Sequence, residues 1–143
     1  MKSLSLLSVT ILLVAVFNRV QSKQFNKCSL ATELSRLGVP KSELPDWVCL
    51  VQHESNFKTN WINKKNTNGS WDFGLFQIND KWWCQGHIRS HNTCNVKCEE
   101  LVTEDIEKAL ECAKVIKRER GYKAWYGWLN NCQNKKPSID ECF

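Results

Sequence analysis

Eight cysteines are the feature that most constrains how this chain of 143 residues can fold. An even number of cysteines in a short secreted chain implies a disulfide framework, which here would contain four bridges. Their spacing alone leaves the pairing open. The cysteines are Cys28, Cys49, Cys84, Cys94, Cys98, Cys112, Cys132 and Cys142.

Residues 1–22 have the pattern of a secretory signal peptide, and all eight cysteines follow them. Lys2 precedes an apolar run from Leu4 to Phe17, which is shorter than the roughly 20 residues that span a bilayer. A buried core helix is the alternative interpretation of this run. We expect cleavage after Ser22, an extracellular location and a single domain over residues 23–143.

The charge of the chain and its distribution argue against two classes of function. Loss of Lys2 and Arg19 with the signal peptide lowers the formal net charge from +5 to +3. This mild charge helps adhesion to an anionic bacterial wall but does not indicate nucleic-acid binding. The mature chain also has no strongly basic amphipathic stretch, so we expect no insertion into membranes.

One cluster has the spacing of zinc ligands. It comprises Cys84, His87, His91, Cys94 and Cys98. Secretion argues against zinc, because these thiols would be oxidised and the other cysteines need partners. We therefore expect disulfides, no metal and no cofactor.

Two helices are predicted in the first part of the domain. Apolar residues at helical spacing mark the first, which stops at Gly38, and the second follows Pro40 and Pro45. Glu54 would lie on the inner side of the second helix, in its last turn. The apolar positions of the two helices are Leu30, Leu34, Leu37, Trp47, Leu50 and Val51.

A hairpin is predicted next, because Asn68-Gly69 favours a tight turn in which both central residues have positive φ. Alternation along the following strand places Ser70 and Asp72 on a polar face, opposite Trp71. The sequence assigns no role to Trp71. Asn68-Gly69-Ser70 is also a glycosylation sequon, but the role in the turn is favoured.

Two more helices complete the expected α+β fold of two lobes. Thr103 is predicted to cap the third helix, with Glu104 and Lys108 as a surface pair. Residues 125–132 predict a short fourth helix. The inward positions of the third helix are Ile106, Leu110 and Ala113.

Glu54 and Asp72 are candidates for paired carboxyl chemistry. A carboxyl group in an apolar setting and a carboxylate in a polar one can have pKa values pushed apart, which suits glycoside hydrolysis. A surface glutamate beside an unrelated turn aspartate is the plainer interpretation. The aromatic content favours the first, because seven tryptophans exceed what core packing usually needs. Indoles such as Trp82 and Trp83 suit the apolar faces of sugars, and one of two adjacent indoles should be exposed.

The chain resembles the c-type lysozyme and α-lactalbumin family over the whole mature domain, and within it the insect lysozymes. The resemblance is carried by the cysteine spacing, "HESNF", "NGSWDFGLFQIN" followed by "KWWC", "CNVKC" and "AWYGW". It implies a lysozyme-like fold and a secreted, bacteriolytic glycoside hydrolase, acting in defence or digestion. Lysozyme is itself the type case of the two-carboxyl mechanism, so the roles below come from the resemblance.

By this resemblance Glu54 matches the general acid and Asp72 the second carboxylate, as nucleophile or stabiliser. Trp125 matches the indole that keeps the acid protonated. The implied reaction is hydrolysis, with retention, of the β-1,4 bond between N-acetylmuramic acid and N-acetylglucosamine in peptidoglycan. Chitin oligomers are expected as weaker ligands and a monomer as the working form. The other implied substrate-binding positions are Trp82, Trp83, Asn66, Gln77, Asn79 and Ala124.

The resemblance also implies a disulfide pattern and an alternative function. The implied bridges are Cys28–Cys142, Cys49–Cys132, Cys84–Cys98 and Cys94–Cys112. Some relatives bind calcium before the third helix, but here Thr103, Lys108 and Ala109 stand where carboxylates would be needed. A non-catalytic saccharide-binding protein is the alternative, although such relatives typically lack one or both carboxyl groups.

Overall fold

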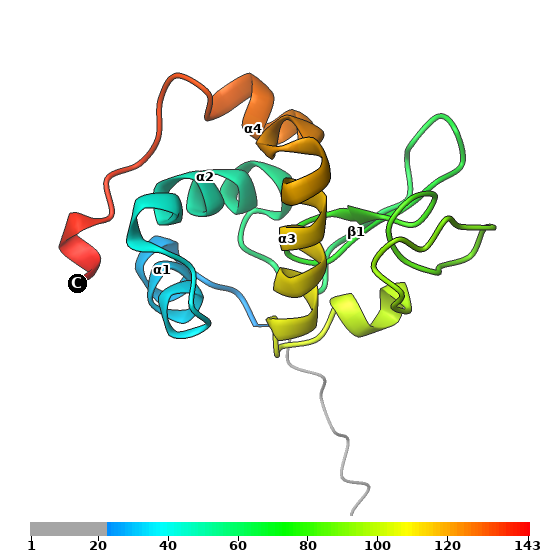
Figure 1. Ribbon diagram of the computed structural model, residues 1–143, viewed down its shortest axis with the longest axis horizontal. Coiled ribbons are helices and arrows are strands. Elements are labelled where there is room, and N and C mark those ends of the chain that lie inside the picture. Colours follow the sequence, from blue (N-terminus) through cyan, green and yellow to red (C-terminus); the bar gives the residue numbers. More distant parts are fainter. Residues whose placement is uncertain (1–22) are drawn as a thin grey trace, which may run out of the picture.

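The computed structural model describes residues 23–143 as a helical lobe beside a lobe of short strands and long loops (Figure 1). The predicted signal peptide lies outside the described residues. The helices are α1 (Lys27–Arg36), α2 (Leu44–Ser55), α3 (Glu107–Arg120) and α4 (Tyr126–Asn131). The strands are β1 (Ile62–Asn63), β2 (Asp72–Phe73) and β3 (Ile78–Asn79). Short 3-10 helices are η1 (Lys41–Glu43), η2 (Cys98–Leu101), η3 (Tyr122–Ala124) and η4 (Asp140–Cys142).

Both ends of α1 have local signals. The side chain of Asn26 accepts a hydrogen bond from the backbone N–H of Ser29, and the Ser29 hydroxyl accepts one from the N–H of Asn26. This reciprocal pair satisfies two donors that a helix start leaves open. Gly38 follows the helix with φ +84°, as the predicted stop requires.

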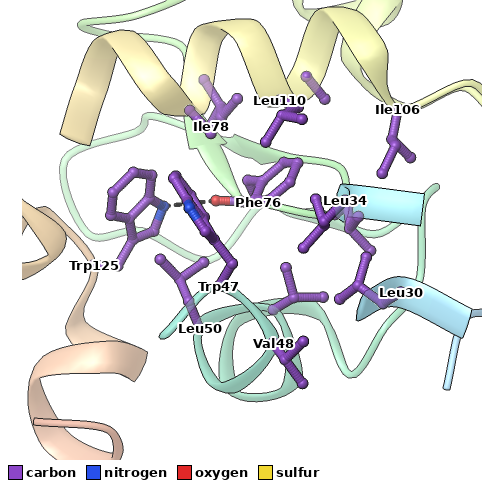
Figure 2. Packing of buried hydrophobic residues seen from close by; sticks show 14 of the residues in the cluster. Leu30, Leu34, Trp47, Val48, Leu50, Phe76, Ile78, Ile106, Leu110 and Trp125 are labelled. Atoms are coloured by element: carbon purple, nitrogen blue, oxygen red, sulfur yellow. Dashed lines mark hydrogen bonds between the residues drawn. The ribbon is translucent and has the colours of Figure 1, made fainter. Parts of the chain in front are cut away.

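Helix α2 forms the centre of the core. Trp47 is fully buried and meets the rings of Phe76 and Trp125 edge-on, at centroid distances of 5.6 and 5.9 Å (Figure 2). The indole N–H of Trp125 donates to the carbonyl of Phe76 at 2.8 Å (Figure 2). These contacts join α2, the turn before β3 and the segment before α4. Glu54 lies in the last turn of α2, as expected.

The sheet is small but sets the register of the polar residues. Its order is β1-β2-β3 and both pairs are antiparallel. Asp72 is directly opposite Asn63 on one side and Asn79 on the other. Because opposite residues in adjacent strands point to the same face, these three side chains form one polar row.

The connection between β1 and β2 differs from the predicted tight hairpin. It runs from residue 64 to 71, and only Gly69 of the Asn68-Gly69 pair has positive φ, +79°. The Asn68 side chain instead accepts a hydrogen bond from the N–H of Ser70 at 3.0 Å. The expectation of two positive φ values was wrong, because Asn68 forms a local side-chain turn within a longer loop.

The predicted start of the third helix was also wrong. Helix α3 begins at Glu107, while the Thr103 hydroxyl donates to the carbonyl of Asp105 in the preceding bend. Glu104 therefore precedes the helix, and the four-residue spacing that would pair it with Lys108 does not apply. Lys108 pairs with Glu100 at 2.5 Å instead. The predicted inward residues are buried.

All eight cysteines are in disulfides, with the pairing that the family resemblance implies. Without free thiolates, the zinc interpretation of residues 84–98 is wrong. The bridges are Cys28–Cys142, Cys49–Cys132, Cys84–Cys98 and Cys94–Cys112.

Gly74 lets the sheet lobe pack closely and gives a test of this fold. Its φ is +73°, and a Cβ there would lie 2.1 Å from the carbonyl oxygen of Leu101. We expect Gly74→Ala to lower the free energy of unfolding by about 1 to 2 kcal/mol for the left-handed backbone. The steric clash should cost roughly 1 to 3 kcal/mol more.

The matched control is Gly38→Ala, which has φ +84° but no atom within 4 Å of the added Cβ. It should show only the backbone cost of about 1 to 2 kcal/mol. Urea unfolding of both variants measures the difference. Equal losses in the two variants would contradict the proposed close packing at Gly74.

Candidate active site

A cleft of about 500 Å³ is lined by residues of α2, the β1–β2 loop, β3 and the segment before α4. All nine catalytic and substrate-binding residues named from the sequence lie in this lining. They are Glu54, Asn66, Asp72, Gln77, Asn79, Trp82, Trp83, Ala124 and Trp125. The lining also contains Tyr126, whose side chain is 79% exposed and which the sequence analysis missed.

Glu54 is a partly buried carboxyl group held at one oxygen. The N–H of Gly127, in α4, donates to its Oε1 at 2.7 Å. Burial raises the pKa of Glu54 above the ordinary value for glutamate; the bond from Gly127 opposes this shift and the charge of Asp72 adds to it. Because desolvation penalises the charged form, the group keeps its proton to higher pH than a surface glutamate does.

Asp72 has a different environment, built from amide groups. Asn79 donates to its Oδ1 at 2.7 Å, and Asn66 donates to its Oδ2 at 2.8 Å. A third amide, from Asn63, also donates to Oδ2, at 3.1 Å. An ionised carboxylate is an acceptor with about four lone-pair positions, so these donors occupy about three of them.

Asn63 is a site residue that the sequence analysis missed. It lies opposite Asp72 in the register of β1 and β2 and donates to both Asp72 and Asn66. Its position could have been found from the sequence only by fixing the register. The sequence analysis expected a tight turn at Asn68-Gly69 and identified no strand before it, so this register was not accessible.

Ser70 joins these amides into one network. Its hydroxyl accepts from Asn66 at 3.3 Å and from Asn79 at 2.8 Å, and donates to Asn68 at 2.7 Å. Ser70 is itself buried. The Asn66 and Asn79 amides that donate to Asp72 are therefore each held by a second hydrogen bond, to the Ser70 hydroxyl.

Gln77 lines the cleft, but its side-chain nitrogen makes hydrogen bonds to the backbone. It donates to the carbonyl oxygens of Trp61 and Gly74, at 3.1 and 2.9 Å. These bonds stabilise a turn in which Gln77 itself has positive φ, 47°. The Gln77 amide N–H groups thus support the cleft wall from behind.

The two adjacent tryptophans differ in exposure, as expected. Trp82 is 44% exposed, and its ring stacks on His91 with a centroid distance of 4.8 Å and an interplanar angle of 5°. Trp83 is half-buried against the core. A second hollow of about 690 Å³ continues past Trp82 and is lined also by His91 and the charged residues Glu119, Arg120 and Lys123.

Comparison with known proteins identifies the family. A model of the C-type lysozyme/alpha-lactalbumin family matches residues 23–142. The chain is 47% identical to lysozyme c-1 of Anopheles gambiae over 137 residues, which are 95% of this chain and 96% of that protein. It is also 47% identical to a lysozyme of Galleria mellonella over 121 residues, or 84% of this chain and 100% of that one. The chain belongs to the C-type lysozyme/alpha-lactalbumin family.

A solved structure agrees with this assignment. The crystal structure of lysozyme from Equus asinus matches with a TM-score of 0.75 and 41% identity, over 83% of this chain and 95% of that one. The insect relatives are named lysozymes and match over most of both chains. This similarity makes the chain a glycoside hydrolase of the lysozyme type.

The described residues offer few ligands for a metal. Within residues 23–143, the one group of three candidate ligands is Cys49, His53 and Cys132, and both cysteines are in the same disulfide. Acidic residues also gather around the start of α3, but Lys108 lies among them and pairs with Glu100. An ammonium group in such a cluster repels a cation.

We therefore predict that calcium does not bind at the acidic cluster around the start of α3. Isothermal titration should show no heat from a micromolar site, and calcium should leave the melting temperature unchanged. Lys108→Ala is the informative variant, because it removes the repelling charge and leaves Glu100 in place. A calcium-dependent rise of the wild-type melting temperature would contradict this prediction.

The pKa of Glu54 can be compared with that of a second glutamate in the same molecule. The side-chain hydrogen bond from Arg36 holds the pKa of Glu33 below its ordinary value, whereas burial raises that of Glu54. Carboxyl-carbon NMR titration should show Glu33 losing its proton first as pH rises, and Glu54 clearly later. The reverse order would contradict the environment assigned to Glu54.

Proposed function

We propose that this chain is a secreted muramidase that hydrolyses the β-1,4 bonds between N-acetylmuramic acid and N-acetylglucosamine in bacterial peptidoglycan. The observation that carries the proposal is a single cleft lined by two carboxyl groups in opposite environments. One, Glu54, has a raised pKa through burial, and the other, Asp72, is surrounded by amide donors. Glycosidases of this class use such a pair.

In this proposal Glu54 donates a proton to the leaving glycosidic oxygen. Its Oε1 accepts from Gly127, which leaves Oε2 to carry the proton. The raised pKa keeps Glu54 protonated above the ordinary range of a glutamate. Activity should therefore persist to higher pH and then fall as pH rises through that pKa.

Asp72 meets the positive charge that develops at the sugar carbon. Its Oδ2 accepts from two amides but its Oδ1 from one, so Oδ1 retains a lone pair for attack. Attack from Oδ1 gives a covalent intermediate, and water activated by Glu54 then releases the sugar with retention. The amides keep the carboxylate in one orientation through both steps.

The aromatic residues supply binding rather than chemistry. The exposed ring of Trp82, stacked on His91, offers a flat apolar surface for a sugar ring. Trp83, Ala124 and Tyr126 continue the same wall. Chitin oligomers, which share the N-acetylglucosamine unit, are proposed as weaker ligands of this wall.

We propose further that residues 1–22 are a signal peptide and that the secreted form works as a monomer without a cofactor. No helix within residues 23–143 is long and apolar enough to cross a bilayer. The formal charge of +3 after cleavage suits adhesion to an anionic cell wall. Bacteriolysis of this kind serves either defence or digestion.

Two substitutions test the chemistry. Glu54→Gln keeps the shape of the side chain but removes the transferable proton, and such transfers contribute typically about 10² to 10⁴-fold to a rate. Asp72→Asn removes the charge and should slow cleavage severely. Both variants should still bind chitin oligomers, because Trp82 and the cleft wall remain. The measurements are clearing of bacterial cell walls and oligosaccharide affinity.

Glu33→Gln, on α1 outside the cleft, is the matched control and should clear cell walls as fast as wild type. If wild type binds oligosaccharides but cleaves nothing, the chain is the non-catalytic saccharide-binding protein. If Glu54→Gln is as active as wild type, Glu54 is not the acid.

A further inference from the structure

Asp80 is a buried carboxylate beside the active site. Its side chain is fully buried, and the backbone N–H of Trp71 donates to its Oδ1 at 2.9 Å. Nδ1 of His87 lies 2.7 Å from Oδ2. This contact is a close charge pair without hydrogen-bond geometry, and Oδ2 has no hydrogen-bond partner among residues 23–143. A buried charge without a partner is costly, so Asp80 depends on His87.

The other nitrogen of His87 faces a second acceptor. Its Nε2 lies 3.0 Å from the carbonyl oxygen of Gly69, in the loop between β1 and β2. Both atoms that face the ring, on Asp80 and on Gly69, are therefore acceptors. A neutral imidazole has one N–H group and can serve only one of them, whereas an imidazolium serves both.

Gly69 belongs to the turn that supplies the Asn66 amide to Asp72. The Gly69 N–H donates to the carbonyl of Asn66, and the Asn66 side chain donates to Asp72. Ser70, the next residue, accepts from both Asn66 and Asn79. A bond to the Gly69 carbonyl therefore holds the turn formed by residues 66–70 against the body of the protein.

Trp71 covers this pair, which accounts for its place beside Asp72. Its ring stacks on His87 with a centroid distance of 3.8 Å and an interplanar angle of 26°. Lys64 lies 4.4 Å from the centroid of the same indole. Asp80 is thus in direct contact with His87, and the Lys64 ammonium lies against the indole that stacks on it. An indole face favours a cation such as imidazolium.

The loop that carries His87 is fitted to Asp80 at one more position. A Cβ on Gly86 would lie 2.7 Å from Oδ2 of Asp80. The absence of a side chain at Gly86 therefore lets the loop close over the carboxylate. The imidazole follows directly along the chain.

We propose that His87 is a positioning residue of the active site: as an imidazolium it joins Gly69 to Asp80 and so fixes the turn that holds Asn66 on Asp72. We call the contacts of His87 with Asp80 and with Gly69 the His87 clamp. Only the effect of this clamp on catalysis rests on the proposed function.

Three substitutions distinguish the contact of His87 with Asp80 from its contact with Gly69. His87→Asn places an amide nitrogen near the position of Nδ1 and can still pair with Asp80, but it cannot reach Gly69. His87→Gln places its amide near the position of Nε2 and can reach Gly69, but it leaves Asp80 unpaired. His87→Phe keeps a ring on Trp71 and removes both donors. Arg89→Gln, an exposed change in the same loop, is the control.

His87→Asn and His87→Gln should have opposite effects on kcat and on the melting temperature. His87→Asn should lower kcat on soluble peptidoglycan fragments about 3- to 10-fold, as expected for one lost hydrogen bond, with oligosaccharide affinity changed less than 2-fold or so. Its melting temperature should stay near that of wild type. His87→Gln should do the opposite, with kcat retained and the melting temperature lowered. His87→Phe should lose both, and Arg89→Gln neither.

Two measurements test the clamp without catalysis. Nitrogen-15 NMR at mildly acidic pH should show both nitrogens of His87 protonated, and hydrogen exchange in residues 66–70 should be faster in His87→Asn than in wild type. A wild type that does not cleave would refute the proposed function, while these two measurements would still decide the clamp. Wild-type kcat and exchange in His87→Asn, or a His87 ring with a single proton, would overturn the proposal.

Discussion

The position of Asp72 depends on side-chain amides, because strands of two residues each provide very few backbone hydrogen bonds. The Asp72 carboxylate accepts hydrogen bonds from the amides of Asn63, Asn66 and Asn79. The Ser70 hydroxyl accepts from two of these amides. The side-chain hydrogen bonds of this network thus hold the strands in place, as backbone hydrogen bonds do in larger sheets. Asparagine residues that look like loop composition in the sequence are structural parts of the site.

Disulfides fix the elements that carry the other half of the site. Cys49 lies in α2 near Glu54, and its partner Cys132 directly follows α4, which contains Gly127. The covalent bond therefore links the helix that bears Glu54 to the helix whose Gly127 N–H donates to Glu54. Cys94–Cys112 similarly joins the long loop after Trp82 and Trp83 to α3. Both walls of the cleft are tied to the helical lobe, which makes its width a property of the fold rather than of the ligand.

The sequence predicted what depends on local pattern and failed where long-range packing decides. Helical spacing located α2 and placed Glu54 on its inner side, and alternation placed Asp72 on the polar face of its strand. The start of α3 was missed, because Asp105 accepts from the N–H of Glu107 and the chain bends around it. The roles of Asn63, Trp71 and His87 were inaccessible, since each depends on a partner brought near by the loop between β1 and β2.

The same loop also affects how the protein ages chemically. An Asn-Gly pair is prone to deamidation, in which the glycine nitrogen attacks the side-chain carbonyl of the asparagine. Here the Gly69 nitrogen donates to the carbonyl of Asn66, and the Asn68 side-chain oxygen accepts from both the N–H and the hydroxyl of Ser70. The folded loop therefore holds both reacting groups in other hydrogen bonds, and we expect this to slow a reaction that would put a new negative charge next to the amides around Asp72. The turn that places Asn66 beside Asp72 thus also protects the chain against one route of chemical ageing.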